Sequence, residues 1–306
     1  MNPFLSVYGH VTIDQIMGVR KFPLDNTTED VVSSSASLGG TGANIAVAAA
    51  RLGCPTALCA FVGADFPGAY EKIMRDSGLM MDDFVRVDGY DSSKAIVVND
   101  RNMVQKVLFY QGPQGFADDT GIMLTDMASR SRFVHFCTGQ PSYYIKVMEQ
   151  LPDAYISLDP AQESHRIWNS GNFPEALGFS DALFCNVIEA GSLVKYIGKD
   201  SIFDAEADLV VCTHGTEGSR ARMGDEILDI PAVRAARTVD VTGAGDTYRA
   251  GFYASLYRGY PIPEALVIAA SAASFAVEEV GALTNSPTWE AALERAEPYF
   301  REISGC

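Results

Sequence analysis

Asp240-Val241-Thr242-Gly243-Ala244-Gly245-Asp246-Thr247 is a glycine-rich octapeptide that leads into an apolar segment with helical spacing, residues 250–257. Gly243 and Gly245 flank Ala244 and predict that a helix begins here. Backbone N–H groups at a helix N-terminus lack intrahelical partners, and the macrodipole adds positive charge, so this stretch is suited to bind phosphate. Asp246 falls in the first turn. Accepting a proton from an attacking hydroxyl would explain a carboxylate beside an anion site; compensation of the helix dipole is the alternative.

A second glycine-rich helix start lies upstream, at Leu38-Gly39-Gly40-Thr41-Gly42-Ala43-Asn44. The alanine-rich segment 45–52 follows it and predicts a helix that stops at Gly53. Small residues let a ligand approach the backbone closely, and Asn44 offers both donors and acceptors. The spacing lacks the third glycine of a dinucleotide-binding fingerprint and the acidic residue expected after it, which disfavours an NAD-dependent oxidoreductase. A P-loop motif is also absent from the sequence.

Together the two stretches resemble the signature regions of the ribokinase-like (PfkB) family of carbohydrate and nucleoside kinases. Three segments between them are similar to further family motifs: Val62-Gly63-Ala64-Asp65-Phe66-Pro67-Gly68, Asn186-Val187-Ile188-Glu189 and Thr213-His214-Gly215-Thr216-Glu217-Gly218. The resemblance covers about residues 5–281, in family order. It implies an ATP-dependent kinase that transfers the γ-phosphoryl group to a hydroxymethyl group of a sugar or a sugar-containing molecule.

Alternating apolar and helical segments predict the fold class, an α/β fold with a doubly wound, mostly parallel sheet flanked by helices. The expected strands are residues 4–8, 56–62, 133–136, 155–158, 182–185 and 209–212. Ligands of such sheets bind outside the carboxyl ends of the strands. Six notable residues are expected there: Asp14, Asp65, Gly139, Asp159, Asn186 and Thr213.

Residues 30–36, 94–99 and 105–110 read as β-structure without intervening helices. The resemblance implies that the chain, residues 1–306, is one ribokinase-like domain, with a small β-sheet lid formed by segments of about 15–37 and 86–112. A lid would keep water from competing with the acceptor hydroxyl. The resemblance also allows a homodimer formed through the lid.

Composition agrees with a soluble globular protein, since 306 residues at 47% hydrophobic and 20% charged suffice for a full core. The 23 basic and 39 acidic residues give a net charge of −16, which argues against nucleic-acid and anionic membrane partners. Backbone dipoles and a metal ion can still bind phosphate locally. The six cysteines and four histidines have no metal-ligand spacing, so no zinc site is expected. The absence of a signal peptide and of a long apolar span favours a cytoplasmic location.

The resemblance assigns the transfer step to the octapeptide. Asp246 would accept the proton of the acceptor hydroxyl, and at a reference pKa of about 3.9 it would already be ionised at neutral pH. The backbone amides of Gly243, Ala244 and Gly245 would hold the transferring phosphoryl group.

The donor side is expected to bind ATP and Mg²⁺. Glu189, with Asn186, would organise Mg²⁺ through water molecules; a capping box, in which Glu189 only caps a helix, is the alternative. The resemblance leaves a monovalent cation open. Three further residues would face the nucleotide phosphates and ribose: Thr213, Gly215 and Gly218.

Two departures from the family pattern concern the C-terminal helices. The alanine-rich segment 269–276, with Ala270 and Ala273, is expected to line the adenine site, or else simply to pack as a helix. Many relatives carry asparagine at the position of Ala270, so a polar adenine contact is missing. Arg249 stands where a small or apolar residue is common, and it could pair with a core carboxylate or reach a phosphate.

The acceptor site is expected to contain Asp14, whose carboxylate can accept hydrogen bonds from both hydroxyls of a sugar diol. Gly39, Gly40 and Asn44 would lie beside it, and Gln140 is a weaker candidate.

A neutral acceptor is preferred because the basic residues of the lid-like segments form no cluster that would bind a phosphorylated sugar. The candidates are Lys21, Lys94, Arg101 and Lys106. Phe109-Tyr110-Gln111 and Tyr143-Tyr144 could stack a nucleobase or could belong to the core. Residues 102–110 with Gly112 are similar to lids of archaeal-type nucleoside kinases. The sequence therefore favours ribose or a ribonucleoside, with a hexose or a sugar phosphate as the alternative. A non-catalytic sensor of nucleotides or sugars would not need Asp246.

Overall fold

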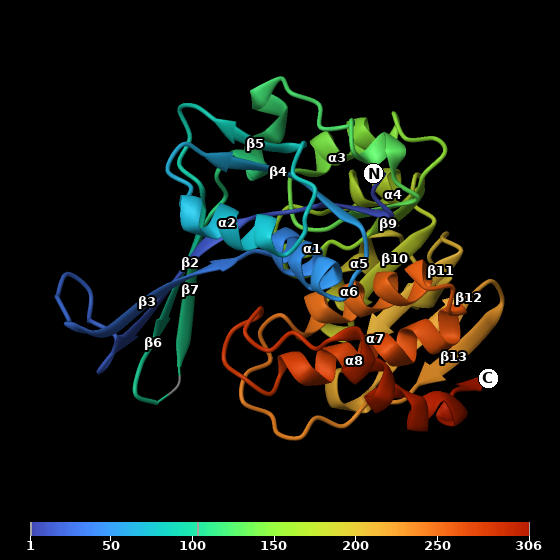
Figure 1. The fold of residues 1–306 in the computed structure, drawn as a ribbon. Helices are drawn as coiled ribbons and strands as arrows, with labels where there is room; N and C mark the ends of the chain where they lie inside the picture. Colours follow the sequence, from blue (N-terminus) through green and yellow to red (C-terminus); the bar gives the residue numbers. More distant parts are fainter. Residues whose placement is uncertain (1, 103, 306) are drawn as a thin grey trace.

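The computed structural model describes residues 2–102 and 104–305, and Met103 of the expected lid and Cys306 lie outside them. Ten strands form the main sheet in the order β14-β13-β12-β11-β10-β9-β8-β1-β4-β5 (Figure 1). Their bounds are β1 Leu5–Tyr8, β4 Thr56–Gly63, β5 Phe84–Val87, β8 Phe133–Phe136, β9 Tyr155–Leu158, β10 Ala182–Asn186, β11 Leu209–Thr213, β12 Ser219–Met223, β13 Glu226–Ile230 and β14 Ser304–Gly305.

The pairing within the sheet confirms the predicted fold class. Strands β5, β4, β1, β8, β9, β10 and β11 are parallel, and β12, β13 and β14 add an antiparallel edge. The chain proceeds outward from β1 in both directions, through β4 on one side and β8 on the other. A crevice opens at the carboxyl ends of strands where the order reverses in this way, so the sheet places a ligand site beside the end of β1.

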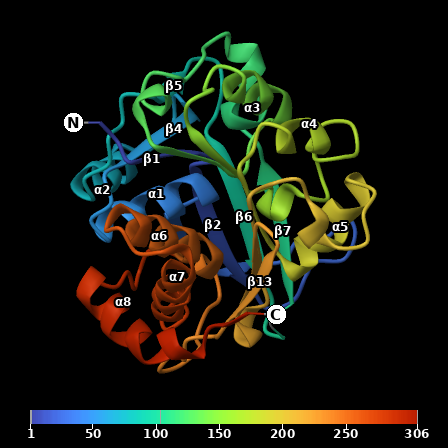
Figure 2. The same ribbon diagram turned by 90° about the vertical axis from the view of Figure 1, so that its right-hand side faces the viewer.

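Helices cover both faces of the sheet and enclose two cores (Figures 1 and 2). Successive residues of a strand point to opposite faces: Val7 of β1 is buried under the helices α1, α6, α7 and α8, and Tyr8 is buried in the second core, on the side of α3 and α4. The helices are α1 Thr41–Arg51, α2 Gly68–Asp76, α3 Pro141–Met148, α4 Phe173–Leu177, α5 Val187–Tyr196, α6 Ala244–Tyr257, α7 Ile262–Ala276 and α8 Trp289–Ala296. The 3-10 turns are η1 Pro113–Thr120, η2 Ala128–Arg130, η3 Ala161–Glu163, η4 Ile202–Asp204, η5 Gly215–Glu217 and η6 Glu297–Glu302. None of the described helices is both long and apolar enough to cross a membrane.

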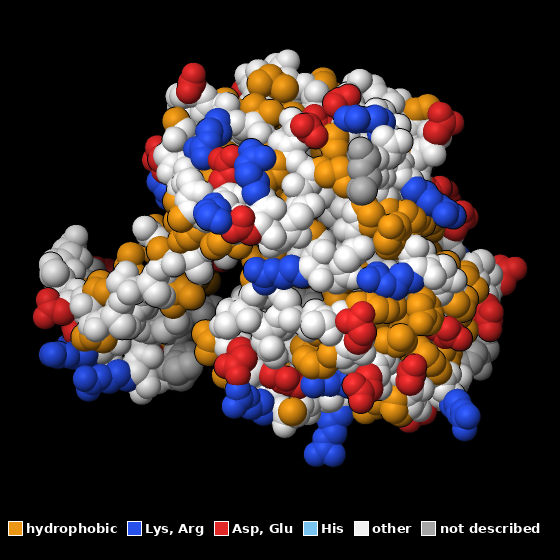
Figure 3. Space-filling model, in the orientation of Figure 1, with side chains coloured by type: hydrophobic (Ala, Val, Ile, Leu, Met, Phe, Trp, Pro, Cys, Tyr) orange, Lys and Arg blue, Asp and Glu red, His pale blue; other side chains and the backbone are white. Residues whose placement is uncertain are grey.

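A separate four-stranded sheet forms the lid, in the order β3-β2-β6-β7. Its strands are β2 Thr12–Val19, β3 Val31–Gly39, β6 Ser93–Asn99 and β7 Gln105–Tyr110, which confirms the β-structure expected there. The lid stands out from the body of the molecule, with a hollow between the two (Figure 3). Asp14 was expected just after a strand, but it lies inside β2, because the chain enters the lid only three residues after β1 ends.

Candidate active site

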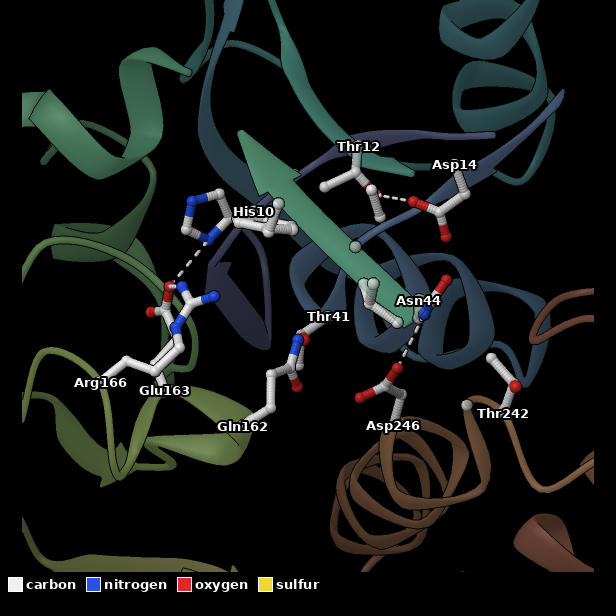
Figure 4. Close-up of a pocket in the computed structure, with 15 residues that line it drawn as sticks. His10, Thr12, Asp14, Thr41, Asn44, Gln162, Glu163, Arg166, Thr242 and Asp246 are labelled. Carbon is white, nitrogen blue, oxygen red and sulfur yellow. Dashed lines mark hydrogen bonds and ion pairs between the residues drawn. The ribbon is translucent and has the colours of Figure 1, made fainter. Parts of the chain in front are cut away.

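A cavity of about 270 Å³ lies where the lid meets the carboxyl end of β1 (Figure 4). It brings together five residues that the sequence predicted for acceptor binding and transfer: Asp14, Gly40, Asn44, Gly243 and Asp246. A second cavity, of about 550 Å³, is lined by five of the residues predicted for the nucleotide: Thr213, Gly215, Gly218, Ala270 and Ala273. Asn186, which was also expected on the nucleotide side, does not line it.

The glycine-rich turn before α6 separates the two cavities. Thr242, Gly243 and Asp246 line the smaller cavity, whereas Ala244 and Gly245 line the larger one. A group transferred between ligands of the two cavities would therefore pass this turn. The arrangement suits a reaction in which the first turn of α6 contacts both the donor and the acceptor.

Gly243 is the N-cap of α6 and adopts a left-handed conformation with φ of 75°. An added Cβ would lie 2.3 Å from Cβ of Ala282, so both the backbone angle and the packing call for glycine. The Ala244 amide donates to the carbonyl of Val241 at 3.3 Å, a long bond that closes the turn. Among the described residues, the amides of Gly243 and Gly245 have no such partner. These two amides are best placed to bind an anion.

Asp246 is held by Asn44, whose Nδ2 donates to Asp246 Oδ2 at 2.7 Å (Figure 4). This bond joins the first turns of α1 and α6, the two glycine-rich helix starts. Burial raises the pKa of Asp246 to about 6, while the bond from Asn44 and the charge of Arg249 oppose that rise. The expectation of an ordinary pKa near 3.9 was therefore wrong. A carboxylate with this pKa is still mostly ionised at pH 7 and is a stronger base than a fully exposed aspartate.

Asp14 lies across the cavity from Asp246 and accepts a hydrogen bond from the hydroxyl of Thr12 (Figure 4). Gly39 does not line the cavity, but a Cβ at Gly39 would lie 2.0 Å from Asp14 Oδ2. Gly39 therefore provides the space that the Asp14 carboxylate occupies. Burial raises the pKa of Asp14, and the bond from Thr12 opposes the rise.

The loop after β9 contributes three residues that the sequence reasoning missed: Gln162, Glu163 and Arg166. Ala161 adopts an unusual positive φ of 49° at the start of this loop. Glu163 is 1% exposed, and its Oε1 accepts from Arg166 Nη2 at 3.1 Å. No glycine stands at the left-handed position, so the sequence contains no indication of a turn here. The signal that could have located this loop is Asp159, which directly follows β9 at the carboxyl end of the sheet.

An aromatic and cationic wall closes the other end of the cavity. The Arg166 guanidinium lies 5.3 Å from the ring centroid of Phe109, and the His10 ring meets Phe109 edge-on at 5.2 Å. Burial lowers the pKa of His10, so its ring is neutral at pH 7. Phe109 is one of the aromatic residues for which stacking on a base and packing in the core were both left open, and it lines the cavity.

Several expected acceptor contacts do not occur. Gln140 does not line the cavity, because its Oε1 accepts the backbone amide of Asp118 at 2.8 Å. Tyr143 and Tyr144 are buried in the second core, as their alternative interpretation required. Lys94 pairs with Asp65 at 2.9 Å. Like Lys94, the other three basic candidates of the lid do not line the cavity: Lys21, Arg101 and Lys106.

Asn186 and Glu189 form the capping box that was the alternative interpretation of their spacing. Asn186 Oδ1 accepts the amides of Ile188 and Glu189, and Glu189 Oε2 accepts the amide of Asn186 at 2.8 Å. Burial and the nearby charge of Asp159 raise the pKa of Glu189 to about 7, while Arg249 opposes the rise. The described residues contain no cluster of three or more metal-ligating side chains. Glu189, with Asn186 beside it, therefore fits only an ion that keeps most of its water shell and uses one carboxylate, which is how Mg²⁺ commonly binds.

Arg249 pairs with a core carboxylate, the first of the two alternatives that the sequence left open. Its Nε donates to Asp159 Oδ2 at 2.8 Å, and neither cavity is lined by Arg249.

Comparison with known proteins places this geometry in context. The sequence matches the pfkB family carbohydrate kinase pattern over residues 2–289. A nucleoside kinase of Methanocaldococcus jannaschii is 30% identical over 300 residues, which cover 96% of this chain and 97% of the relative. A nucleoside kinase of Methanothermobacter thermautotrophicus is 32% identical over 296 residues, which cover 95% and 94%. The structure also superposes on the crystal structure of the Methanocaldococcus jannaschii nucleoside kinase, an archaeal member of the ribokinase family, with a TM-score of 0.88 at 28% identity. The superposition covers 97% of this chain and 100% of the nucleoside kinase.

Proposed function

We propose that this chain, which belongs to the pfkB family of carbohydrate kinases and is an ATP-dependent kinase of sugars or nucleosides, phosphorylates a ribonucleoside. The observation that carries the proposal is the wall of Phe109, His10 and Arg166 in the same cavity as Asp14 and Asp246. Ribose alone would need only the end that contains the two aspartates. A planar base attached to the ribose would pack against the aromatic wall.

Charge in the cavity favours a neutral acceptor over a sugar phosphate. Arg166 is the basic residue of the cavity lining, and its guanidinium is paired with the buried carboxylate of Glu163 at 3.1 Å. A phosphate group bound there would compete with Glu163 for the same cation and would meet two further carboxylates, Asp14 and Asp246. Recognition of a phosphorylated sugar normally uses basic side chains that are free to pair with it.

The transfer step follows from the residues on either side of the glycine-rich turn. Asp14 would hold the ribose diol, which would direct the hydroxymethyl group toward Asp246. Asp246 would take the hydroxyl proton as the oxygen attacks the γ-phosphorus. The bond from that phosphorus to the β–γ bridging oxygen would break, and ADP would leave. The amides of Gly243 and Gly245 would stabilise the charge on the transferring group.

Mg²⁺ and Glu189 form a further part of the proposal. The bound ion would neutralise phosphate charge, as it does in other phosphoryl transfers. Glu189 would hold it through water, since Oε2 already accepts the amide of Asn186. A monovalent cation is proposed on family resemblance alone, and turnover measured with and without K⁺ tests it.

The lid offers a surface for a second copy of the chain. Its strands expose Val31, Val32 and Leu108 at 51%, 53% and 66%. Large apolar side chains exposed on both edge strands of the lid are available to a protein interface, so we propose a homodimer formed through the lid. Sedimentation of wild type and of Leu108→Lys tests this: the wild type should be dimeric and the variant monomeric, and a monomeric wild type would contradict it.

The acceptor proposal is tested by kcat/KM for adenosine, inosine, cytidine and ribose with ATP, in wild type and in Phe109→Ala. A ribonucleoside should be the best acceptor. Phe109→Ala should lower its kcat/KM at least about tenfold, because a stacked aromatic contact is lost, and should change that of ribose much less. Equal losses for nucleoside and ribose, or a clear preference of the wild type for ribose, would contradict the proposal.

A further inference from the structure

Arg249 is a buried cation one helical turn after Asp246 on α6. Its side chain forms a two-point pair with Asp159: Nε donates to Oδ2 at 2.8 Å and Nη2 to Oδ1 at 3.4 Å. Its Nη1 donates to the carbonyl oxygen of Gly245 at 3.3 Å. Arg249 is 5% exposed and Asp159 is 1% exposed, so the pair is shielded from solvent. Because Asp159 follows β9, the pair ties the middle of the sheet to the turn that carries Asp246.

A second contact along the same helix supports this attachment. His135 of β8 is fully buried, and its Nδ1 lies 2.9 Å from the hydroxyl of Tyr253, one turn after Arg249. The other ring nitrogen, Nε2, lies 3.5 Å from Asp159 Oδ2. Burial lowers the pKa of His135, so the ring is neutral at pH 7. Arg249 therefore supplies the charge that balances Asp159.

The guanidinium also acts on the carboxylate that the proposed reaction uses as its base. Its charge lowers the pKa of Asp246 against the effect of burial. Charges this deeply buried are poorly screened by salt. If Arg249 were absent, three neighbouring acids would lie next to an incoming triphosphate: Asp159, Asp246 and Glu189. No buried cation would lie among them to offset their repulsion.

A role in stability alone does not explain this choice of residue. Replacement of a buried ion pair by apolar residues is often neutral or even stabilising, so a fold does not need such a pair for its own sake. What the apolar alternative would lose is the bond to Gly245 and a positive charge close to Asp246. We propose that Arg249, paired with Asp159, is a positioning residue for phosphoryl transfer that fixes the first turn of α6 and keeps Asp246 in its charged, aligned state.

The inference rests on the proposed role of Asp246 but not on the identity of the acceptor. It is tested with ATP and whichever of adenosine, inosine, cytidine or ribose the wild type phosphorylates fastest. Arg249→Met should lower the plateau kcat, measured at a pH where Asp246 is ionised, by about ten- to hundredfold, the order expected for small misplacements of a reacting group. The acceptor KM should change much less than kcat. Arg249→Lys keeps the charge and should recover part of the loss.

The pH profile separates alignment from charge. The groups that face Asp246 are Asn44 of α1, Asp14 of β2, Cys137 after β8, Asp159 after β9, Glu189 of α5 and Arg249 itself. Arg249→Met removes the one cation, so the acid limb of kcat/KM should move to higher pH. In the double variant Arg249→Met with Asp159→Leu, a nearby negative charge is removed as well, so the limb should return toward that of the wild type. The plateau kcat of the double variant should stay low because the tether to Gly245 is still absent.

Stability is followed in parallel by urea unfolding, with Arg258→Met, at the far end of α6, as a matched arginine control that should leave kcat unchanged. If the double variant folds and regains the full wild-type kcat, Arg249 serves only to balance Asp159, and the inference is overturned. An unchanged kcat and acid limb in folded Arg249→Met would also overturn it. Wild-type turnover in Asp246→Asn would instead remove the base assignment itself, so the two failures are distinguishable.

Discussion

The bond between Asn44 and Asp246 predicts a measurable shift in the pH dependence of the reaction. Asn44 Nδ2 donates to Asp246 Oδ2 at 2.7 Å, and the pKa of Asp246 is about 6 with this bond in place. Hydrogen bonds to charged groups contribute about 1.5–3 kcal/mol. Since one pKa unit corresponds to about 1.36 kcal/mol, Asn44→Ala should raise the pKa of Asp246 by about one to two units.

The sign follows from the role of the carboxylate. A base must be ionised, so activity is lost as the pH falls through its pKa, and a higher pKa moves that loss to higher pH. In Asn44→Ala the acid limb of kcat/KM should therefore lie at about pH 7–8 instead of about 6. At pH 7 the ionised fraction would fall from about nine-tenths to between a half and a tenth.

The assay is a pH profile of kcat/KM, which reports ionisations of the free enzyme. Asn44 Oδ1 is buried with no partner among the described residues and is available to the acceptor, so the variant should also have a higher KM. For this reason the pH at which the acid limb lies, and not the size of kcat/KM, is the diagnostic quantity. Thr41→Val, from the same cavity wall but without a bond to Asp246, should leave the limb in place. A limb that stays near pH 6 in Asn44→Ala would refute the reasoning.

Three further predictions concern other residues of the site. The wild type should use a deoxy acceptor that lacks one diol hydroxyl with a kcat/KM about tenfold or more below that of the parent acceptor, because a lost charge-assisted hydrogen bond costs about 1.5–3 kcal/mol. Asp14→Ala should abolish most of this discrimination. Equal use of both acceptors by the wild type would contradict the prediction. Glu189→Gln should raise the Mg²⁺ concentration needed for half-maximal turnover. The thermal stability of the nucleotide-free protein should change little, since glutamine can still accept a hydrogen bond from the amide of Asn186. A large loss of stability with unchanged Mg²⁺ dependence would show that Glu189 acts only as a helix cap. Gly243→Ala should lower both the turnover and the urea concentration at the unfolding midpoint. The added Cβ would meet Ala282, and the left-handed backbone conformation costs alanine about 1–2 kcal/mol. An unchanged midpoint would show that the turn tolerates a side chain.

Strands, helix starts and the two glycine-rich segments could be predicted from the sequence, because each depends on local patterns. Apolar runs bounded by polar residues located β1, β4 and β8 to β11, and the glycines located the starts of α1 and α6. The antiparallel hairpin of β12 and β13 was not predicted, since its residues alternate weakly and its turn is marked only by Gly224.

The parts of the site that were missed depend on tertiary contacts. Glu163 and Arg166 enter the cavity through a turn whose left-handed residue is Ala161, and alanine gives no signal for that conformation. The pKa of Asp246 depends on burial between two helices that are about two hundred residues apart in sequence, which no local pattern records. Gln140 looked like a ligand because it follows a strand, but its side chain satisfies the amide of Asp118.

The central claim, that Asp246 is the base of an ATP-dependent transfer, is tested most directly by single-turnover kinetics of Asp246→Asn with saturating ATP and acceptor. Asparagine fills the same space and can still contact Asn44, so the fold and the affinity for ATP should be retained. The rate of phosphoryl transfer should fall by about 10²–10⁴-fold, the usual contribution of a general base. A variant that binds ATP normally and transfers the phosphoryl group at the wild-type rate would contradict the claim.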